Sequence, residues 1–256
     1  MTNSLAGKVA LITGSSRGIG RAIAVKLAGQ GARCVLTGRD SEALSGVAKE
    51  IGDAQWLALD LRQPESAGRL VQFAAGQCGR IDIVVNNAGA TKRGEFDELT
   101  DEDWLDGFAL KFFGAVRVTR AAWPHLRATQ GSLLNIAGAG GRTPGPLFSV
   151  GGSVNAALMA LTKSLADTGL ADGIQVNTIN PGVVRTDRMR RRLADLAARQ
   201  GIEASAAERS LVAEERIVRV GEPEEIAELA GFVVGPLGRF LHGSLIDMDG
   251  GATKSV

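Results

Sequence analysis

Residue runs that favour β-strands alternate along the chain with longer stretches of helical pattern. Short apolar runs bounded by turn residues indicate buried strands, and longer amphipathic stretches indicate helices. The sequence predicts strands at Lys8–Ile12, Arg33–Thr37, Gln55–Leu59, Ile81–Val85, Ser132–Ile136, Gln175–Ile179 and Ser244–Met248. It predicts helices at Gly18–Ala28, Ser41–Ile51, Glu65–Gln77, Asp103–Thr129, Ser153–Leu170 and Glu224–Val234.

This alternation predicts the fold class. Strands separated by helices at this period form a parallel sheet that is covered by helices on both faces. We therefore expect a single α/β domain over residues 1–256, a doubly wound Rossmann fold with a seven-stranded parallel sheet. Right-handed crossovers would place a ligand at the carboxyl ends of the strands.

Residues 185–215 depart from this pattern. The stretch is charged and helical, and it follows a predicted strand end, where a lid over a ligand site can lie. Its arginines include Arg185, Arg188, Arg190, Arg191 and Arg192. Such a run is able to bind a carboxylate or phosphate substrate. A solvated helix face is the more ordinary interpretation.

The composition limits the partners. The chain has 256 residues, is 45% hydrophobic and 22% charged, and has a formal net charge of +1. Near-neutral charge gives no support for a nucleic-acid or anionic-membrane partner. No apolar run approaches the roughly 20 residues needed to span a bilayer, and the N-terminal residues lack a signal-peptide pattern. We expect a cytoplasmic protein that acts on a small molecule.

Cysteine and histidine form no metal-binding pattern. Cys34 and Cys78 are unpatterned, and the histidines His125 and His242 are far apart in the sequence. Buried thiols in a reducing compartment fit these cysteines better than a disulfide or a zinc site. We predict no metal.

A glycine-rich turn follows the first predicted strand and precedes the first helix, reading Thr13-Gly14-Ser15-Ser16-Arg17-Gly18-Ile19-Gly20. Glycines allow a sharp turn and a close approach to a pyrophosphate, and a helix N-terminus offers free N–H groups. An ordinary tight turn is the alternative, but the strand before and the helix after favour a dinucleotide site.

With further motifs in the same order, the chain resembles the short-chain dehydrogenase/reductase family over nearly its whole length. These motifs are Asp60, Asn86-Asn87-Ala88-Gly89, Asn180-Pro181-Gly182 and Asp249-Gly250-Gly251. The resemblance implies that Asp60 holds the adenine, that Asn87 stabilises the sheet centre and the cofactor, and that Thr186 with the Pro-Gly segment meets the nicotinamide amide. The predicted cofactor-binding residues are Gly14, Ser16, Arg17, Gly18, Ile19, Gly20, Arg39, Asp60, Leu61, Asn87, Ala88, Gly89, Pro181, Gly182, Val184 and Thr186.

The end of the second strand favours NADP(H) over NAD(H). An NAD site places a carboxylate there, whereas an NADP site uses cations for the 2′-phosphate. The sequence reads Leu36-Thr37-Gly38-Arg39, and Asp40 comes one position too late. Arg39 and Arg17 can converge on the phosphate. The alternative is that both are solvated surface arginines.

The chain contains no tyrosine, although the family uses a tyrosine for proton transfer. The family's Asn, Ser, Tyr and Lys positions align, through their flanking residues, with Lys111, Gly138, Gly151 and Asn155. All four catalytic residues are therefore changed, and the family's chemistry cannot be transferred directly.

The changes suggest an exchange of Lys and Asn between positions 111 and 155. In the family these two side chains lie close together beside the nicotinamide ribose. An exchanged pair would keep one ammonium and one amide there, and a desolvated lysine could donate a proton. Lys111 and Asn155 are thus candidate catalytic residues. The alternative is that Lys111 extends to solvent and that Asn155 caps or packs.

Gly151 and Gly152 are poor helix residues. They suit either close backbone approach or a helix that begins later, with Ser153 as its cap. Ser153 is also the hydroxyl nearest to the missing phenol and is a third catalytic candidate. Phe112, Phe113 and Phe148 could fill the vacated volume or simply belong to the core.

Three functions remain open. The leading hypothesis is an NADP(H)-dependent oxidoreductase of a carbonyl or alcohol compound with a non-standard proton path. The alternative is a non-catalytic NADP-binding sensor or scaffold, which the glycines at 138 and 151 favour. A dehalogenase- or lyase-like reaction is weaker, because such derivatives lose the cofactor motif. The long helices resemble those of the family's two-fold interface, so we expect a homotetramer or homodimer.

Overall fold

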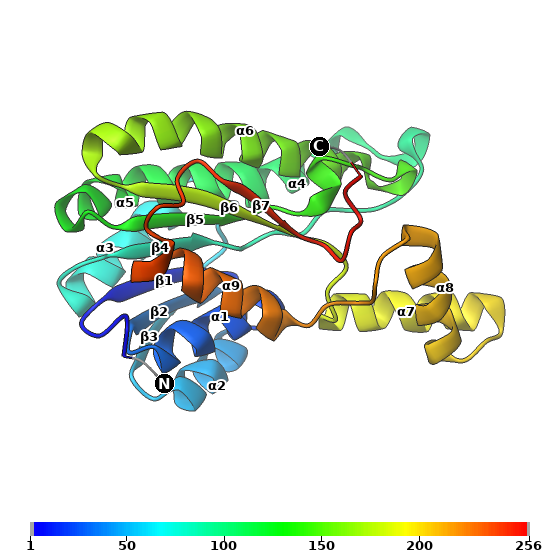
Figure 1. The fold of residues 1–256 in the computed structure, drawn as a ribbon, viewed down its shortest axis with the longest axis horizontal. Helices are drawn as coiled ribbons and strands as arrows, with labels where there is room; N and C mark the ends of the chain where they lie inside the picture. Colours follow the sequence, from blue (N-terminus) through cyan, green and yellow to red (C-terminus); the bar gives the residue numbers. More distant parts are fainter. Residues whose placement is uncertain (1–2, 255–256) are drawn as a thin grey trace.

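A computed structural model describes residues 3–254, and these residues form a three-layer α/β structure (Figure 1). All adjacent strands are parallel, in the order β3-β2-β1-β4-β5-β6-β7. The strands are β1 (Val9–Thr13), β2 (Arg33–Gly38), β3 (Ala54–Ala58), β4 (Ile83–Asn86), β5 (Ser132–Ile136), β6 (Gln175–Pro181) and β7 (Leu245–Met248). The predicted doubly wound fold is confirmed, with small shifts at strand ends.

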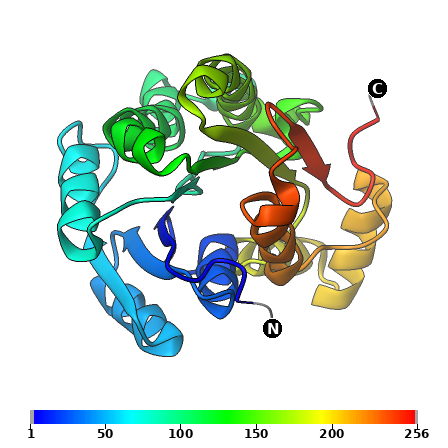
Figure 2. The same ribbon diagram turned by 60° about the vertical axis from the view of Figure 1, so that its left-hand side comes forward.

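Helices cover both faces of the sheet (Figure 2). On one face lie α1 (Gly18–Gly29), α2 (Ser41–Ile51) and α9 (Pro223–Val233), whose buried residues share a cluster with β1 and β2. On the other lie α3 (Ser66–Cys78), α5 (Gly114–Thr129) and α6 (Ser149–Asp172). The strands β1, β4, β5 and β6 are buried throughout, as expected for a parallel sheet between two helical layers.

The predicted helix Asp103–Thr129 is continuous but not uniform. It consists of α4 (Asp101–Gly107), a π-helical segment Phe108–Phe113 and α5. Thr100 and Asp103 form a capping box at its start, which explains why the helix begins two residues earlier than predicted. Lys111 lies in the π segment, a distortion often found at functional sites.

The predicted start of α6 at Ser153 is wrong. The helix begins at Ser149 and runs through Gly151 and Gly152. Both glycines are buried, and a side chain on either would overlap Phe148 or Pro144. Tertiary packing therefore overrides their low helix propensity, and Ser153 is an exposed residue inside the helix rather than a cap.

The stretch 185–215 contains two helices, α7 (Asp187–Gln200) and α8 (Ala204–Glu215), with a left-handed Gly201 after the first. They pack on each other through a separate small cluster of Met189, Leu193, Ala197, Ala207 and Leu211. In Figure 1 the pair projects at one end of the molecule, beyond β6.

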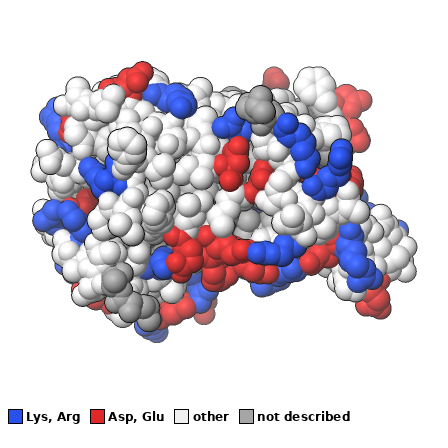
Figure 3. All heavy atoms as spheres, viewed as in Figure 1, with Lys and Arg blue, Asp and Glu red and all other residues white. Residues whose placement is uncertain are grey.

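On the face in Figure 3, acidic side chains form a band across the lower middle of the molecule, with basic side chains beside it and over the rest of the face. Among the described helices, none is both long and apolar enough to cross a membrane. Residues 3–254 contain no group of potential metal ligands, and Cys34 and Cys78 are free thiols.

Candidate functional site

The site lies where the strand order reverses, between β1 and β4, at the carboxyl edge of the sheet. This is the position at which open α/β sheets bind ligands. A cavity of about 500 Å³ begins there and extends toward α6 and α7. Its walls come from the glycine-rich turn, the loops after β4, β5 and β6, and the two helices of residues 185–215.

The glycine-rich turn is fixed by close backbone packing. A side chain at Gly20 would overlap the carbonyl oxygen of Gly14, and one at Gly14 would lie 2.8 Å from Cα of Ala88. Gly14 and Gly18 also have positive φ, at 64° and 56°. Only glycine meets both demands, so the turn leaves its backbone accessible at the N-terminus of α1.

The residues at the end of β2 fit a phosphate better than a ribose diol. Arg17 and Arg39 are exposed, and neither forms an ion pair within residues 3–254. A Cβ on Gly38 would lie 3.3 Å from Ser16 Oγ, which places Arg39 beside the glycine-rich turn. Asp40 caps α2 instead, accepting from the Ala43 N–H at 3.0 Å.

Asn87 joins β1 to β4 at the centre of the edge. Its Nδ2 donates to the carbonyl oxygens of Thr13 and Gly14, each at 3.0 Å. The backbone N–H groups of Asn87 and Ala88 donate to Thr13 Oγ1. Asn87 thus holds the glycine-rich turn against the loop after β4, and both Asn87 and Gly89 line the cavity.

Asp60 and Leu61 lie outside the main cavity, at the end of β3. The Asp60 carboxylate accepts hydrogen bonds from the Arg62 side chain, with Nη2 at 2.8 Å. This pairing, aided by the charge of Arg39, lowers the pKa of Asp60, so the carboxylate stays ionised. Leu61 is buried.

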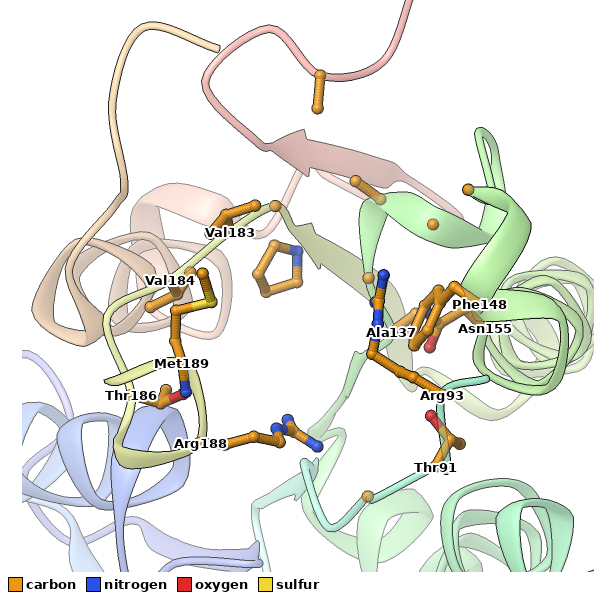
Figure 4. A pocket seen from close by; sticks show the side chains of 18 of the residues that line it. Thr91, Arg93, Ala137, Phe148, Asn155, Val183, Val184, Thr186, Arg188 and Met189 are labelled. Atoms are coloured by element: carbon orange, nitrogen blue, oxygen red, sulfur yellow. The ribbon is translucent and has the colours of Figure 1, made fainter. Parts of the chain in front are cut away.

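The segment after β6 forms the opposite wall. Pro181, Gly182, Val184 and Thr186 all line the cavity, and Figure 4 shows Thr186 and Val184 on the same side of it. A Cβ on Gly18 would lie 3.2 Å from Thr186 Cγ2. Thr186 therefore sits over the start of α1 while its hydroxyl caps α7.

Lys111 and Asn155 are directly hydrogen-bonded, as the predicted exchange requires. Lys111 Nζ donates to Asn155 Oδ1 at 2.6 Å and to the Ala137 carbonyl oxygen at 2.5 Å. Its aliphatic chain crosses Gly89, where a Cβ would lie 2.7 Å from Lys111 Cδ. Burial and the charge of Arg188 lower the pKa of Lys111 to about 7. The alternative in which Lys111 extends to solvent is wrong.

Asn155 also occupies space that a side chain at Gly138 would need. A Cβ on Gly138 would lie 2.7 Å from Asn155 Nδ2, and Gly138 has φ of 153°. Because an ammonium requires an acceptor, Oδ1 faces Lys111 and Nδ2 faces Gly138. The amide donor thus stands beside the position where the family has its serine.

The Phe148 ring occupies the space beside Gly151, the position where the resemblance implies a tyrosine. A Cβ on Gly151 would overlap the Phe148 ring, and one on Gly140 would lie 2.8 Å from it. Gly151 is helical, without positive φ. Phe112 and Phe113 form an edge-to-face pair with ring centroids 5.4 Å apart, and neither lines the cavity. Of the three phenylalanines considered, only Phe148 fills the site.

Ser153 does not reach the cavity. Because α6 already begins at Ser149, a residue two positions after Gly151 lies on a different side of the helix, and Ser153 is exposed. The structure brings Lys111 and Asn155 together at the site and leaves Ser153 outside it.

The arginine run divides into two groups. Arg185 pairs with Glu208 and Glu222, and Arg190 pairs with Asp187. Arg188 and Arg192 instead line the cavity. Sequence reasoning missed Arg93, which belongs to the loop after β4 and lines the cavity opposite α7. No sequence pattern marks this position as part of the site.

Comparison with known proteins supports this geometry. The sequence profile described as short chain dehydrogenase matches residues 8–197. The chain is 35% identical over 252 residues to an uncharacterized oxidoreductase of Mycobacterium tuberculosis, covering 96% of this chain and 92% of the relative. It is 29% identical to the NADPH-dependent reductase BacG of Bacillus subtilis, covering 97% and 99%.

Solved structures agree closely with the fold. The L-sorbose reductase of Gluconobacter frateurii, complexed with NADPH and L-sorbose, has a TM-score of 0.96 and 32% sequence identity, with all of both chains covered. A short chain dehydrogenase from Burkholderia cenocepacia in complex with NADP has a TM-score of 0.87 and 31% identity, covering 97% of this chain and 99% of that one.

Proposed function

The chain belongs to the short-chain dehydrogenase/reductase family, and on this premise we propose that it is an NADP(H)-dependent oxidoreductase of a small carbonyl or alcohol compound, with Lys111 and Asn155 as its proton-handling pair. The observation that carries the proposal is the direct hydrogen bond from Lys111 Nζ to Asn155 Oδ1 at 2.6 Å, on the wall of the cavity. The exchanged residues keep the polar pair that the family has there.

The residues present fit an NADP dinucleotide. The glycine-rich turn has no room for side chains at Gly14 or Gly20, so its backbone can cradle a pyrophosphate at the start of α1. Arg17 and Arg39 would hold the 2′-phosphate, and the relatives named for NADPH support this choice. When bound, the cofactor would supply or accept the hydride.

Lys111 has the properties of a proton donor near neutral pH. An ammonium has three N–H donors, and Asn155 Oδ1 and the Ala137 carbonyl oxygen take two of them. The third remains available to a group in the cavity. A pKa of about 7 means that Lys111 can release this proton without a large energetic cost.

Asn155 would orient Lys111 and polarise a substrate oxygen. Its Oδ1 is committed to Lys111, so its Nδ2 remains a donor beside Gly138. A buried amide donor can stabilise developing negative charge as a serine hydroxyl does. We propose that Asn155 takes the serine's role in this way.

The helices α7 and α8 would act as the lid over this site, as residues 185–215 were predicted to do. Met189, Arg188 and Arg192 from α7 and Glu214 and Glu215 from α8 line the cavity. The pair has its own apolar cluster, so it could move as a unit when a ligand binds.

A closed homodimer or homotetramer is part of the proposal. Leu105 of α4, Phe113 of the π segment and Leu170 of α6 are 70%, 45% and 70% exposed, on the helices expected to form the interface. Exposed large apolar side chains on paired helices favour symmetric association. Sedimentation as a monomer at micromolar concentration would contradict this.

The proposal is tested by following NADPH absorbance with a panel of ketones, quinones and imines. Lys111→Met should lower turnover by about 10²–10⁴-fold and weaken NADPH binding. Lys163→Met, at an exposed position on α6, is the matched control and should behave like the parent.

The sensor or scaffold function is the alternative, favoured by Gly138 and Gly151, which leave no hydroxyl at the family's serine and tyrosine positions. It would be supported if NADPH binds, the whole panel is inert and Lys111→Met affects binding alone.

Arg39→Ala tests the cofactor separately. The preference of the Arg39→Ala variant for NADPH over NADH should fall about 10–100-fold relative to the parent, because one of the two phosphate contacts is lost. An unchanged preference would show that Arg39 does not bind the 2′-phosphate.

A further inference from the structure

Arg93 places a guanidinium in the cavity beside the residues that replace the family's catalytic groups. It belongs to the loop that follows β4, and its Cζ lies 4.6 Å from the centroid of the Phe148 ring. Figure 4 shows the Arg93 side chain over Phe148, on the side of the cavity opposite Arg188 and Met189. Stacking on an aromatic ring restricts a guanidinium while leaving its N–H groups free to bind.

A second arginine faces the same space from the other wall. Arg192 of α7 lines the cavity. The burial of Arg93, followed by the charges of Arg192 and Arg188, lowers the pKa of Arg93. Arginine remains protonated in proteins, so the repulsion persists as long as no anion lies between the two side chains.

The three arginines that line the cavity have no carboxylate partner in the part of the chain that the structure describes. Within residues 3–254, Arg93, Arg188 and Arg192 form no ion pair, whereas Arg185 and Arg190 do. Glu214 and Glu215 also line the cavity, and Glu215 partly offsets the repulsion at Arg93. Neither glutamate is within ion-pair distance of Arg93.

The cofactor would use only part of this charge. The charge of Arg17 in the glycine-rich turn acts on Arg188, and the charge of Arg188 acts on Arg93 and Lys111, so Arg188 lies between the cofactor side of the cavity and Arg93. Arg93 itself lies against the Phe148 ring. The positive charge that is left for a second ligand is that of Arg93 and Arg192.

We infer that the substrate of the proposed reductase carries an oxyanion group, a carboxylate or a phosphate, which Arg93 binds from its position on Phe148 with Arg192 on the opposite wall. This inference rests on the proposed function and names its substrate class. Guanidinium groups bind both anions through paired hydrogen bonds. The bound anion would hold the carbonyl beside Lys111 and Asn155, and a neutral ketone would lack this anchor.

The test is calorimetric binding to the NADP⁺-loaded protein, which does not require turnover. The probes are 2-oxobutanoate and its methyl ester, and hydroxyacetone phosphate and hydroxyacetone. Each anion should bind at least about tenfold more tightly than its neutral partner if it is the substrate type. The anion with the larger gain in affinity over its neutral partner shows whether the site binds a carboxylate or a phosphate.

Variants then locate the anion. Arg93→Met and Arg192→Met should each weaken anion binding by about 10- to 100-fold without changing NADP⁺ affinity. Arg191→Met is the matched control on the same helix, because Arg191 is exposed and does not line the cavity. It should behave like the parent.

Two results would overturn the inference. The first is equal affinity for the anionic and the neutral probes. The second is an Arg93→Met variant whose affinity for the anions equals that of Arg191→Met. Two further titrations separate the two proposals: NADP⁺ alone into the protein, and the anionic probes into the protein without cofactor. If NADP⁺ fails to bind, the proposed function is wrong. Anion binding that depends on Arg93 in the second titration would still support the oxyanion site.

Discussion

The two halves of the cavity place different demands on the sequence. The cofactor half, formed by the glycine-rich turn, Asn87 and the end of β2, is built from backbone groups and from glycines that nothing else can replace. The catalytic half, formed by Lys111, Gly138, Phe148, Gly151 and Asn155, is built from side chains that fill one another's space. In the alignment expected from the sequence, the first half keeps the family's pattern, and the second differs from it at positions 111, 138, 151 and 155.

The difference shows which substitutions a fold can absorb. A backbone cradle has no alternative solution, because a side chain at Gly20 meets a carbonyl oxygen. A side-chain constellation can be rearranged, provided that volume and hydrogen bonds are matched again. Phe148 restores volume beside Gly151, and Lys111 with Asn155 restores a hydrogen-bonded pair.

The largest expected effect comes from breaking the cofactor half. Gly20→Ala would force a methyl group against the backbone of Gly14. We expect a loss of about 3 kcal/mol in the free energy of unfolding and a fall of about 100-fold or more in NADPH affinity. Urea denaturation and fluorescence titration measure these two quantities.

The same helix supplies the control. Gly29 lies at the end of α1, and nothing is within 4 Å of a Cβ placed there. Gly29→Ala should be neutral or slightly stabilising, by up to about 1 kcal/mol. If Gly20→Ala were equally harmless, the cofactor half would be as adaptable as the catalytic half.

In the catalytic half, one substitution should instead reduce the cost of another. Gly151→Tyr alone should cost about 2 kcal/mol, because Phe148 occupies the space of the new side chain. Combined with Phe148→Ala, the cost should shrink, with a favourable coupling of about 1–2 kcal/mol in a double-mutant cycle. Strictly additive effects would show that Phe148 does not substitute for the tyrosine.

The sequence predicted the local structure of the cofactor half well, because that structure depends on backbone groups and glycines. Its strand, turn and helix follow from local pattern, and Gly14, Gly20 and Asn87 lie as expected. The start of α6 was not predictable from propensity, because Gly151 and Gly152 are held in the helix by Phe148 and Pro144. Arg93 was missed because a loop arginine has no pattern until the fold places it opposite α7.

The next effect concerns the buried charge of Lys111. Its pKa is about 7 in the folded protein and near 10.4 in an unfolded chain. Between these values the unfolded state binds more protons, so this group adds stability as pH rises from about 7 to about 10.5. Below pH 7 both states are protonated and the gain is absent.

A comparison of the parent with Lys111→Met isolates this group. The difference in the free energy of unfolding between the parent and the variant should rise by about 1–2 kcal/mol from pH 6 to pH 10. This is less than the difference between the two pKa values of Lys111 would give, because water in the open cavity weakens the cost of the buried charge. The contribution of Cys34 to the pH dependence is the same in both proteins and cancels in the difference. A difference that does not vary with pH would mean that Lys111 keeps an ordinary pKa, which would weaken its role as a proton donor.

The smallest effect returns to the cofactor half and to Asp40, the acid that directly follows Arg39 at the end of β2. Asp40 accepts from the Ala43 N–H as the cap of α2, so its carboxylate is already used within the protein. Asp40→Ala should cost about 1 kcal/mol in the free energy of unfolding, and Glu42→Ala in the same first turn should cost less. Affinities for NADPH and NADH should both stay unchanged. If the Asp40→Ala variant bound NADH more weakly but kept its affinity for NADPH, Asp40 would contact a ribose hydroxyl of NADH. The preference for NADPH would then depend on the balance between the charge of Asp40 and the charges of Arg17 and Arg39, and not on the absence of a competing acid.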